Sequence, residues 1–152
     1  MSGILVLAIG KMKSGALADA LKEYQKRMRV KVTVQEIDLR DCDAAKLQEK
    51  ESKALLAAIP KDSFVVALDE RGKTLKSRDF AAKMRGWRET SGKTIVFLIG
   101  GADGHTDFLR KKANFVLSFG EMTWPHMLAR VMLMEQLYRA EAISSGHPYH
   151  RD

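Results

Sequence analysis

The chain has 152 residues, of which 45% are hydrophobic and 30% are charged, and its formal net charge is +7. These values are ordinary for a soluble globular protein, and the length predicts one domain over residues 1–152 with a buried core. The single cysteine, Cys42, excludes an intramolecular disulfide and favours a cytoplasmic location. The basic excess favours a polyanionic partner, RNA or DNA; the alternative is a solvated basic surface without a ligand.

Strand-like and helix-like segments alternate in the first half, as in an α/β domain with a mostly parallel sheet. Residues 4–9 are continuously apolar, so we expect a strand buried on both faces. This run is too short to cross a membrane and lacks the layout of a signal peptide. A helix is predicted over 16–28, a strand nearer the sheet edge over 30–39 and a second helix over 43–59, with Pro60 after its end.

The second half continues the same alternation. Its predicted elements are a buried strand at 64–68, a helix capped by Ser77 that runs to about 90, a strand at 94–99, a short helix at 106–112, a strand at 115–118, and a long helix that follows residue 125 and runs to about 144. After the first of these strands, residues 69–73 predict a polar turn in which Asp69 and Glu70 are solvated.

The last predicted helix is apolar over much of its circumference and therefore needs burial on two sides. Its apolar residues are Met127, Leu128, Val131, Met132, Leu133, Met134, Leu137 and Tyr138. The sheet can cover one side, and we expect a second copy of the chain to cover the other, which predicts a homodimer through this helix. The alternative is that the sheet of one chain covers the helix deeply enough by itself.

A glycine-rich turn follows the strand at 94–99, with the sequence Gly100-Gly101-Ala102-Asp103-Gly104. Its G-G-x-x-G spacing differs from the dinucleotide fingerprint G-x-G-x-x-G and follows the fourth strand, which argues against a nicotinamide site. Alone, the turn is better explained as a tight connection between a strand and a helix.

Two further strand ends are expected on the same side of a parallel sheet, at Leu68 and at Ser118. Ligands of open α/β sheets bind at the carboxyl ends of the strands. The three loops that start here can surround one flat heterocycle, with backbone groups for hydrogen bonds and with Leu68, Met122 and Trp124 for apolar contact.

Four segments together resemble the ribosomal RNA large subunit methyltransferase H family, which consists of small SPOUT-class enzymes. They are Gly100-Gly101-Ala102-Asp103-Gly104, Thr123-Trp124-Pro125-His126, Leu137-Tyr138-Arg139-Ala140 and His147-Pro148-Tyr149-His150-Arg151. The resemblance covers essentially the whole chain, and the C-terminal segment is its most specific part. It implies an α/β fold with a C-terminal trefoil knot and methylation of N3 of a pseudouridine in 23S rRNA of the ribosome, with S-adenosylmethionine as cofactor.

The resemblance also implies the positions of the site. The cofactor would contact Leu68, Gly100, Gly120, Glu121, Met122, Thr123, Trp124 and Pro125. It further implies that the tail of one subunit completes the pocket of the other, which would make the homodimer obligatory for activity.

Transfer of a methyl group to a base nitrogen needs alignment of the two centres and removal of the N3 proton. A histidine can accept that proton, an arginine can hold phosphate or the base edge, and a tyrosine can stack on a base. The predicted catalytic residues are His126, Arg139, His150 and Arg151, and the predicted RNA contacts are Tyr149 and His147. The plainer interpretation of each histidine is a hydrogen bond to the backbone.

Two other functions remain open from the sequence. One is a ribosome-associated protein that binds RNA without catalysis, and the other is a SPOUT methyltransferase that acts on tRNA. No cluster of His, Cys and Asp has the spacing of a metal site, so we predict no metal.

Overall fold

The structure is a computed structural model that describes residues 3–40 and 43–152, so the prediction for Cys42 lies outside the described residues. Its elements are β1 (Ile4–Ile9), α1 (Ala16–Arg27), β2 (Val32–Ile37), α2 (Ala44–Ala58), β3 (Ser63–Thr74), α3 (Ser77–Ser91), β4 (Thr94–Ile99), α4 (Asp107–Lys112), β5 (Phe115–Ser118) and α5 (His126–Ser145). The strands form one parallel sheet in the order β2-β1-β4-β3-β5. The predicted α/β fold with a parallel sheet is confirmed, and β2 lies at an edge as predicted.

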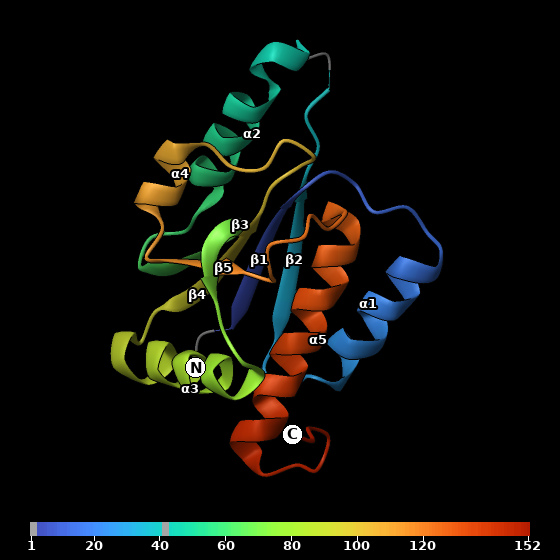
Figure 1. Ribbon diagram of the computed structural model, residues 1–152, viewed down its shortest axis with the longest axis vertical. Helices are drawn as coiled ribbons and strands as arrows, with labels where there is room; N and C mark the ends of the chain where they lie inside the picture. Colours follow the sequence, from blue (N-terminus) through green and yellow to red (C-terminus); the bar gives the residue numbers. More distant parts are fainter. Residues whose placement is uncertain (1–2, 41–42) are drawn as a thin grey trace.

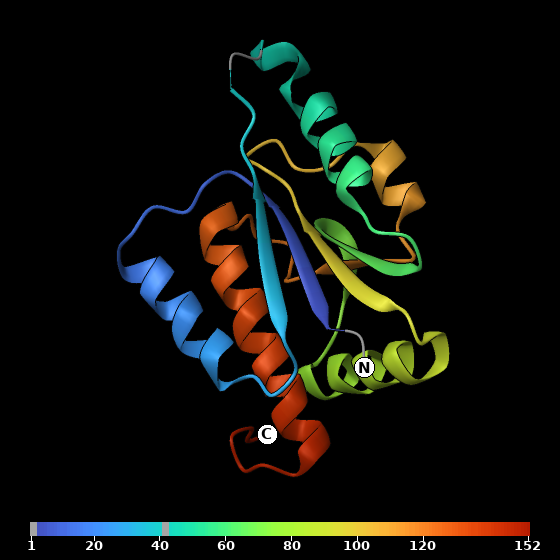
Figure 2. The same cartoon turned by 180° about the vertical axis from the view of Figure 1, so that it is seen from behind.

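Helices cover both faces of the sheet, which explains the continuous apolar runs of the central strands. One face packs against α1, α3 and α5, and the other against α2 and α4 (Figures 1 and 2). Successive residues of each strand alternate between the two cores, so that Phe97 of β4 faces α3 and Leu98 faces the opposite layer. On that opposite side, Leu55 of α2 and Leu109 of α4 are fully buried.

The C-terminal helix α5 lies over the sheet between α1 and α3 (Figure 1). Glu141 ties it to the connection between α1 and β2, because its carboxylate accepts the backbone N–H of Arg29 at 2.8 Å and of Val30 at 3.0 Å. Val131 is only 9% exposed within the single chain, whereas Leu128 and Met132 remain half-buried. Much of the apolar circumference of α5 is therefore covered by its own chain, so this property alone does not require a partner.

Two local sequence predictions are wrong. The strand predicted at 64–68 continues as β3 to Thr74, with a register shift between Leu68 and Lys73 where residues 69–73 were expected to form a turn. This path depends on Gly72, because a Cβ there would lie 2.6 Å from the carbonyl oxygen of Val116. The second wrong prediction concerns the residue that caps α3.

At the start of α3, the N-cap residue is Lys76 and not Ser77. The Ser77 hydroxyl donates to Gln136 Oε1 of α5 at 2.9 Å, so it fastens two helices together instead of capping one.

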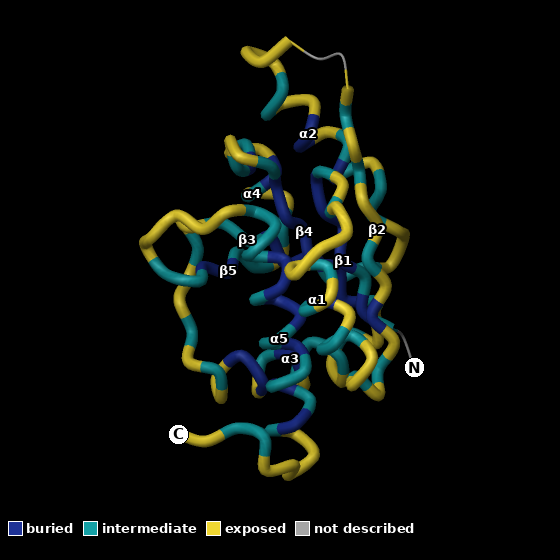
Figure 3. Tube along the Cα trace, turned by 90° about the vertical axis from the view of Figure 1, so that its right-hand side faces the viewer, coloured by how far each residue is buried: buried dark blue, intermediate teal, exposed yellow. Residues whose placement is uncertain are grey.

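Burial is uneven along the molecule (Figure 3). The central strands and the inner side of α5 are buried, whereas the start of α2 and most of the C-terminal tail are exposed. Among the described residues, no helix is both long enough and apolar enough to span a bilayer. The trefoil knot implied by the resemblance stays a prediction.

Candidate cofactor site at the carboxyl ends of the strands

The loops after β4 and β5 meet the part of β3 that follows Leu68, and together they enclose a cavity of about 220 Å³. It is lined by Leu68, Asp69, Glu70, Arg71, Ile99, Gly100, Gly101, Ala102, Asp103, Gly104, Leu117, Phe119, Gly120, Met122, Thr123, Trp124, His126 and Ala129. We call it the cofactor cavity. A parallel sheet brings these loops together because all its strands end at the same edge.

Most of the predicted cofactor contacts line this cavity. Leu68, Gly100, Gly120, Met122, Thr123 and Trp124 do so, and the predicted catalytic residue His126 joins them. Glu121 and Pro125 belong to the same loop but are not among the lining residues. The assignment of individual contacts stays a prediction.

Glycine is required at two positions of the cavity wall. A Cβ at Gly100 would lie 3.1 Å from the carbonyl carbon of Gly104 and 3.2 Å from His105 Nδ1, so the glycine turn closes against itself. Gly120 has φ +113°, a backbone conformation that other residues rarely adopt. The wall therefore presents backbone groups to the cavity at close range.

The loop between β5 and α5 is fixed at its base and open at its tip. Ser118 Oγ donates to the carbonyl of Gly120 at 2.9 Å and accepts the Gly120 N–H at 3.0 Å. Thr123 Oγ1 donates to Glu70 Oε2 at 3.1 Å, which links the loop to β3. Met122 is 75% exposed and Trp124 is 41% exposed, so these two apolar side chains stand at the mouth of the cavity.

Asp69 was expected to be solvated in a turn, but its side chain is buried. Its side chain is only 3% exposed, and Arg110 of α4 donates to Asp69 Oδ2 at 3.0 Å. Arg110 also donates to the carbonyl of His105 at 2.6 Å. The pair locks the second half of β3 to the loop after β4. Nothing in the hydrophobic pattern of the sequence signals this contact.

His126 occupies the first position of α5 beside a buried arginine. Arg130 is 2% exposed and donates to Glu36 and to the carbonyls of Ile9 and Gly10. Burial and the positive charge of Arg130 lower the pKa of His126, so its imidazole is neutral near pH 7. A neutral imidazole can accept a proton.

The other predicted catalytic and RNA-contact residues lie together at the far end of α5. Arg139 donates to Glu135 at 2.6 Å and to His150 Nδ1 at 3.0 Å, and its guanidinium lies 4.8 Å from the centre of the Tyr149 ring. His150 Nε2 then bonds Asp152 at 3.1 Å. We call Arg139, Tyr149, His150 and Asp152 the tail cluster.

The tail cluster is anchored to its own chain. Arg78 of α3 forms an ion pair with Asp152 at 2.7 Å, and the Tyr149 ring packs edge-on against Tyr138 at 4.7 Å. Burial, followed by contacts with Tyr24 and Glu135, raises the pKa of Tyr149 to about 12, so its hydroxyl keeps its proton. His147 and Arg151 are exposed beside the cluster.

No residue of the tail cluster lines the cofactor cavity of the same chain. The helix α5 begins at His126, and Arg139 follows 13 residues later, which is about 20 Å at the usual rise of about 1.5 Å per residue. The structure therefore brings His126 to the cofactor cavity but does not bring Arg139, His150 or Arg151 there within one chain.

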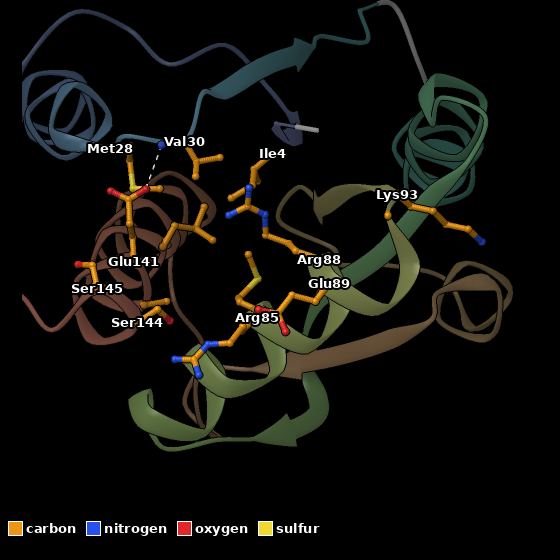
Figure 4. Close-up of a pocket in the computed structure, with 14 residues that line it drawn as sticks. Ile4, Met28, Val30, Arg85, Arg88, Glu89, Lys93, Glu141, Ser144 and Ser145 are labelled. Carbon is orange, nitrogen blue, oxygen red and sulfur yellow. Dashed lines mark hydrogen bonds between the residues drawn. The ribbon is translucent and has the colours of Figure 1, made fainter. Parts of the chain in front are cut away.

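A second cavity, of about 440 Å³, lies at the opposite edge of the sheet between α3 and α5 (Figure 4). Its lining combines apolar side chains such as Ile4, Met84 and Leu137 with the charged side chains of Arg88 and Glu89. None of the predicted site residues lines it. Within residues 3–40 and 43–152, no three His, Cys, Asp or Glu side chains are grouped as metal ligands would be.

Comparisons with known proteins agree with this architecture. The family model described as "Predicted SPOUT methyltransferase" matches residues 3–150. A protein of Paramagnetospirillum magneticum named ribosomal RNA large subunit methyltransferase H is 46% identical over 149 residues, which cover 97% of this chain and 98% of the relative. A protein of Rhodospirillum centenum with the same name is 46% identical over 95% of both chains.

Solved structures support the fold. A methylase family protein from Haemophilus influenzae matches with a TM-score of 0.58 at 15% identity, over 97% of this chain and 68% of that one. The SpoU methyltransferase AviRb from Streptomyces viridochromogenes, solved in complex with AdoMet, matches with a TM-score of 0.51 at 12% identity. The match covers 94% of this chain but only 62% of AviRb. The chain belongs to the SPOUT methyltransferase family, in the group of the ribosomal RNA large subunit methyltransferase H proteins.

Proposed function

We propose that this protein methylates N3 of a pseudouridine in the 23S rRNA of the large ribosomal subunit, with S-adenosylmethionine as the methyl donor. The observation that carries the proposal is the cofactor cavity, in which the part of β3 after Leu68 and the loops after Ile99 and Ser118 converge. The names of the 46% identical relatives support ribosomal RNA as the substrate. The resemblance of the glycine turn and of the tail segment supports the choice of nucleotide, and a ribosomal substrate places the activity in the cytoplasm.

The residues of the cavity fit S-adenosylmethionine. Leu68, Leu117 and Ile99 offer apolar contact for a flat ring, and the closely packed glycine turn offers backbone hydrogen-bonding groups. Met122 and Trp124 stand at the mouth, where they can cover a bound molecule. The cofactor supplies a methyl group that is already electrophilic because it is bonded to a sulfonium sulfur.

The protein's own contribution is alignment and removal of a proton. The N3 lone pair of the base forms the new bond to carbon, the sulfur keeps the electron pair of the broken bond, and the N3 proton leaves to an acceptor. Holding N3 in line with the methyl group can lower the barrier by up to about 10 kcal/mol. Within one chain, His126 is the proton acceptor, because it lines the cavity and its imidazole is neutral.

The two halves of the site meet in a homodimer, in which the tail of one subunit reaches the cofactor cavity of the other. A groove of about 510 Å³ follows α5 past Met132 and Glu135 and ends at Phe119 and Gly120, which also line the cofactor cavity. A partner segment seated in this groove would arrive at the cavity. There Arg139 and Arg151 of the tail end would hold phosphate or stabilise the N3 anion, and Tyr149 would stack on a base.

The test is transfer of labelled methyl from S-adenosylmethionine to ribosomes and to free large-subunit RNA from cells that lack this protein. We expect label on N3 of one pseudouridine of 23S rRNA. Label on tRNA alone would identify a different RNA substrate. RNA binding without transfer to any RNA would favour the non-catalytic ribosome-associated protein.

A further inference from the structure

One face of α2 holds the glycine turn of the cofactor cavity from behind. Gln48 Nε2 donates to the carbonyl of Asp103 at 2.7 Å and lies 3.2 Å from the carbonyl oxygen of His105. Ser52 Oγ accepts the backbone N–H of Thr106 at 3.1 Å. These side chains are one helical turn apart, so the turn is supported along its length by polar groups of a helix outside the cavity.

Glu51 lies on the same face and has a different environment. It is 6% exposed, and its Oε1 is buried without a hydrogen-bond partner among the described residues. Its two carboxylate oxygens lie 2.8 and 2.9 Å from the position that a Cβ of Gly101 would take. The carboxylate can approach this closely because Gly101 has no side chain, and Gly101 itself lines the cavity.

The cavity is acidic although the chain as a whole is basic. Asp69, Glu70, Asp103 and Arg71 line it. Because Asp69 is paired with Arg110, the excess of negative charge comes from Glu70 and Asp103 against Arg71. Glu51 adds a buried carboxylate behind the glycine turn. Burial and the nearby charge of Asp103 raise the pKa of Glu51, which means that its ionised form is held at a free-energy cost. A cation in the cavity would offset that cost.

We propose that Glu51, acting through the glycine turn, makes the cofactor cavity prefer the cationic sulfonium of S-adenosylmethionine over the uncharged thioether of S-adenosylhomocysteine. This inference rests on the proposed function. Methyl transfer removes the positive charge of the sulfur, so the electrostatic attraction that favours the substrate is lost in the product. The same carboxylate therefore strengthens binding of the cofactor and gives the product no such attraction.

The test compares the affinities of both molecules by titration calorimetry for the wild-type protein and for Glu51→Gln. A unit charge acting across a partly screened protein interior changes the binding of a cation by about tenfold. We therefore expect Glu51→Gln to weaken the binding of S-adenosylmethionine about tenfold relative to the binding of S-adenosylhomocysteine. Sinefungin, which carries an ammonium group in place of the sulfonium methyl, should follow S-adenosylmethionine.

Glu49→Gln is the matched control. Glu49 lies on the same helix, undergoes the same change of charge and is 64% exposed in an ion pair with Lys53. We expect its affinity ratio to equal that of the wild type. Glu51→Asp keeps the charge and should keep most of the preference for S-adenosylmethionine, even if its shorter side chain weakens the binding of both molecules.

The outcomes separate this inference from the proposed function. Equal weakening of both ligands in Glu51→Gln would mean that Glu51 only supports the loop, and unchanged affinities would mean that its charge does not reach the ligand; either result overturns the inference. Absence of binding of either molecule to the wild-type protein would overturn the proposed function itself.

Discussion

The two ends of α5 differ in the kind of chemistry they hold. At His126 the helix begins under a cavity walled by glycine turns and backbone groups, with one imidazole held neutral. At Gly146 it ends beside a cluster of arginine, tyrosine and histidine that lines no part of that cavity. We propose that the first end holds a cofactor and the second a polar substrate. The difference teaches that one chain holds these two groups about 20 Å apart, counted along α5 from His126 to Arg139.

Removing the tail tests the substrate end and should have the largest effect. Deletion of residues 149–152 should lower methyl transfer by about a hundredfold or more, because charged and stacking groups are lost. The dissociation constant of S-adenosylmethionine should stay unchanged, since none of residues 149–152 lines the cavity of its own chain. Single-turnover assays and calorimetry measure the two quantities.

The control for the deletion is Arg78→Gln, which removes the exposed ion pair with Asp152 from the side of α3, keeps every residue of the tail and should leave turnover nearly intact. Normal turnover by the deletion variant would show that the tail has no part in the reaction.

Altering the wall tests the cofactor end. Gly120→Val forces a branched side chain into φ +113°, and Gly100→Val places atoms against Gly104. Each variant should abolish measurable binding of S-adenosylmethionine while circular dichroism still shows a folded protein. Gly86→Ala serves as the control, because a Cβ there meets no atom within 4 Å. Retained affinity in both valine variants would remove these loops from the cofactor site.

Charged substitutions on the outer face of α5 test whether methyl transfer needs residues from two subunits. Leu128→Glu combined with Met132→Lys places charges at half-buried positions of the proposed dimer face. We expect a monomer by light scattering that binds S-adenosylmethionine and transfers no methyl group. Ala82→Glu, on the exposed side of α3, should leave the dimer intact. A stable monomer with full activity would contradict the proposed interface.

The smallest expected effect concerns the charge behind the cavity. The pKa of Glu51 is raised in the folded protein, so folding favours its protonated form, and stability falls as pH rises from the unfolded value of about 4.5. Glu51→Gln should therefore raise the melting temperature at pH 8 by a few degrees and change it little at pH 4. An equal shift at both pH values would mean that packing, not charge, is responsible.

The order of elements could be predicted from the sequence because each strand and helix has a clear hydrophobic period. The hydrophobic pattern nevertheless predicted that this strand ends at Leu68. The strand continues as β3 because Gly72 lies close to the backbone of Val116. The hydrophobic pattern also indicated a partner over α5, although α1 and α3 already cover much of that helix. The path of β3 comes from a tertiary contact that local patterns do not encode, and the partner over α5 stays a prediction.

The cofactor cavity was predictable from three strand ends of one parallel sheet, together with the resemblance. The supports behind it were not. Asp69 and Glu51 look like ordinary polar residues of a turn and of a helix surface, yet one pairs with Arg110 and the other lies against Gly101. Their partners are at least 41 residues away in the chain, so no local spacing marks them.

The most direct test of the central claim is complementation between two inactive variants. Gly120→Val subunits keep the tail and lose the cofactor cavity, whereas subunits that lack residues 149–152 keep the cavity and lose the tail. Random pairing gives half of the dimers one intact site, so the mixture should recover about a quarter of the wild-type methyl transfer. If the mixed dimers form and the mixture stays as inactive as each variant alone, the two halves of the site do not meet between subunits.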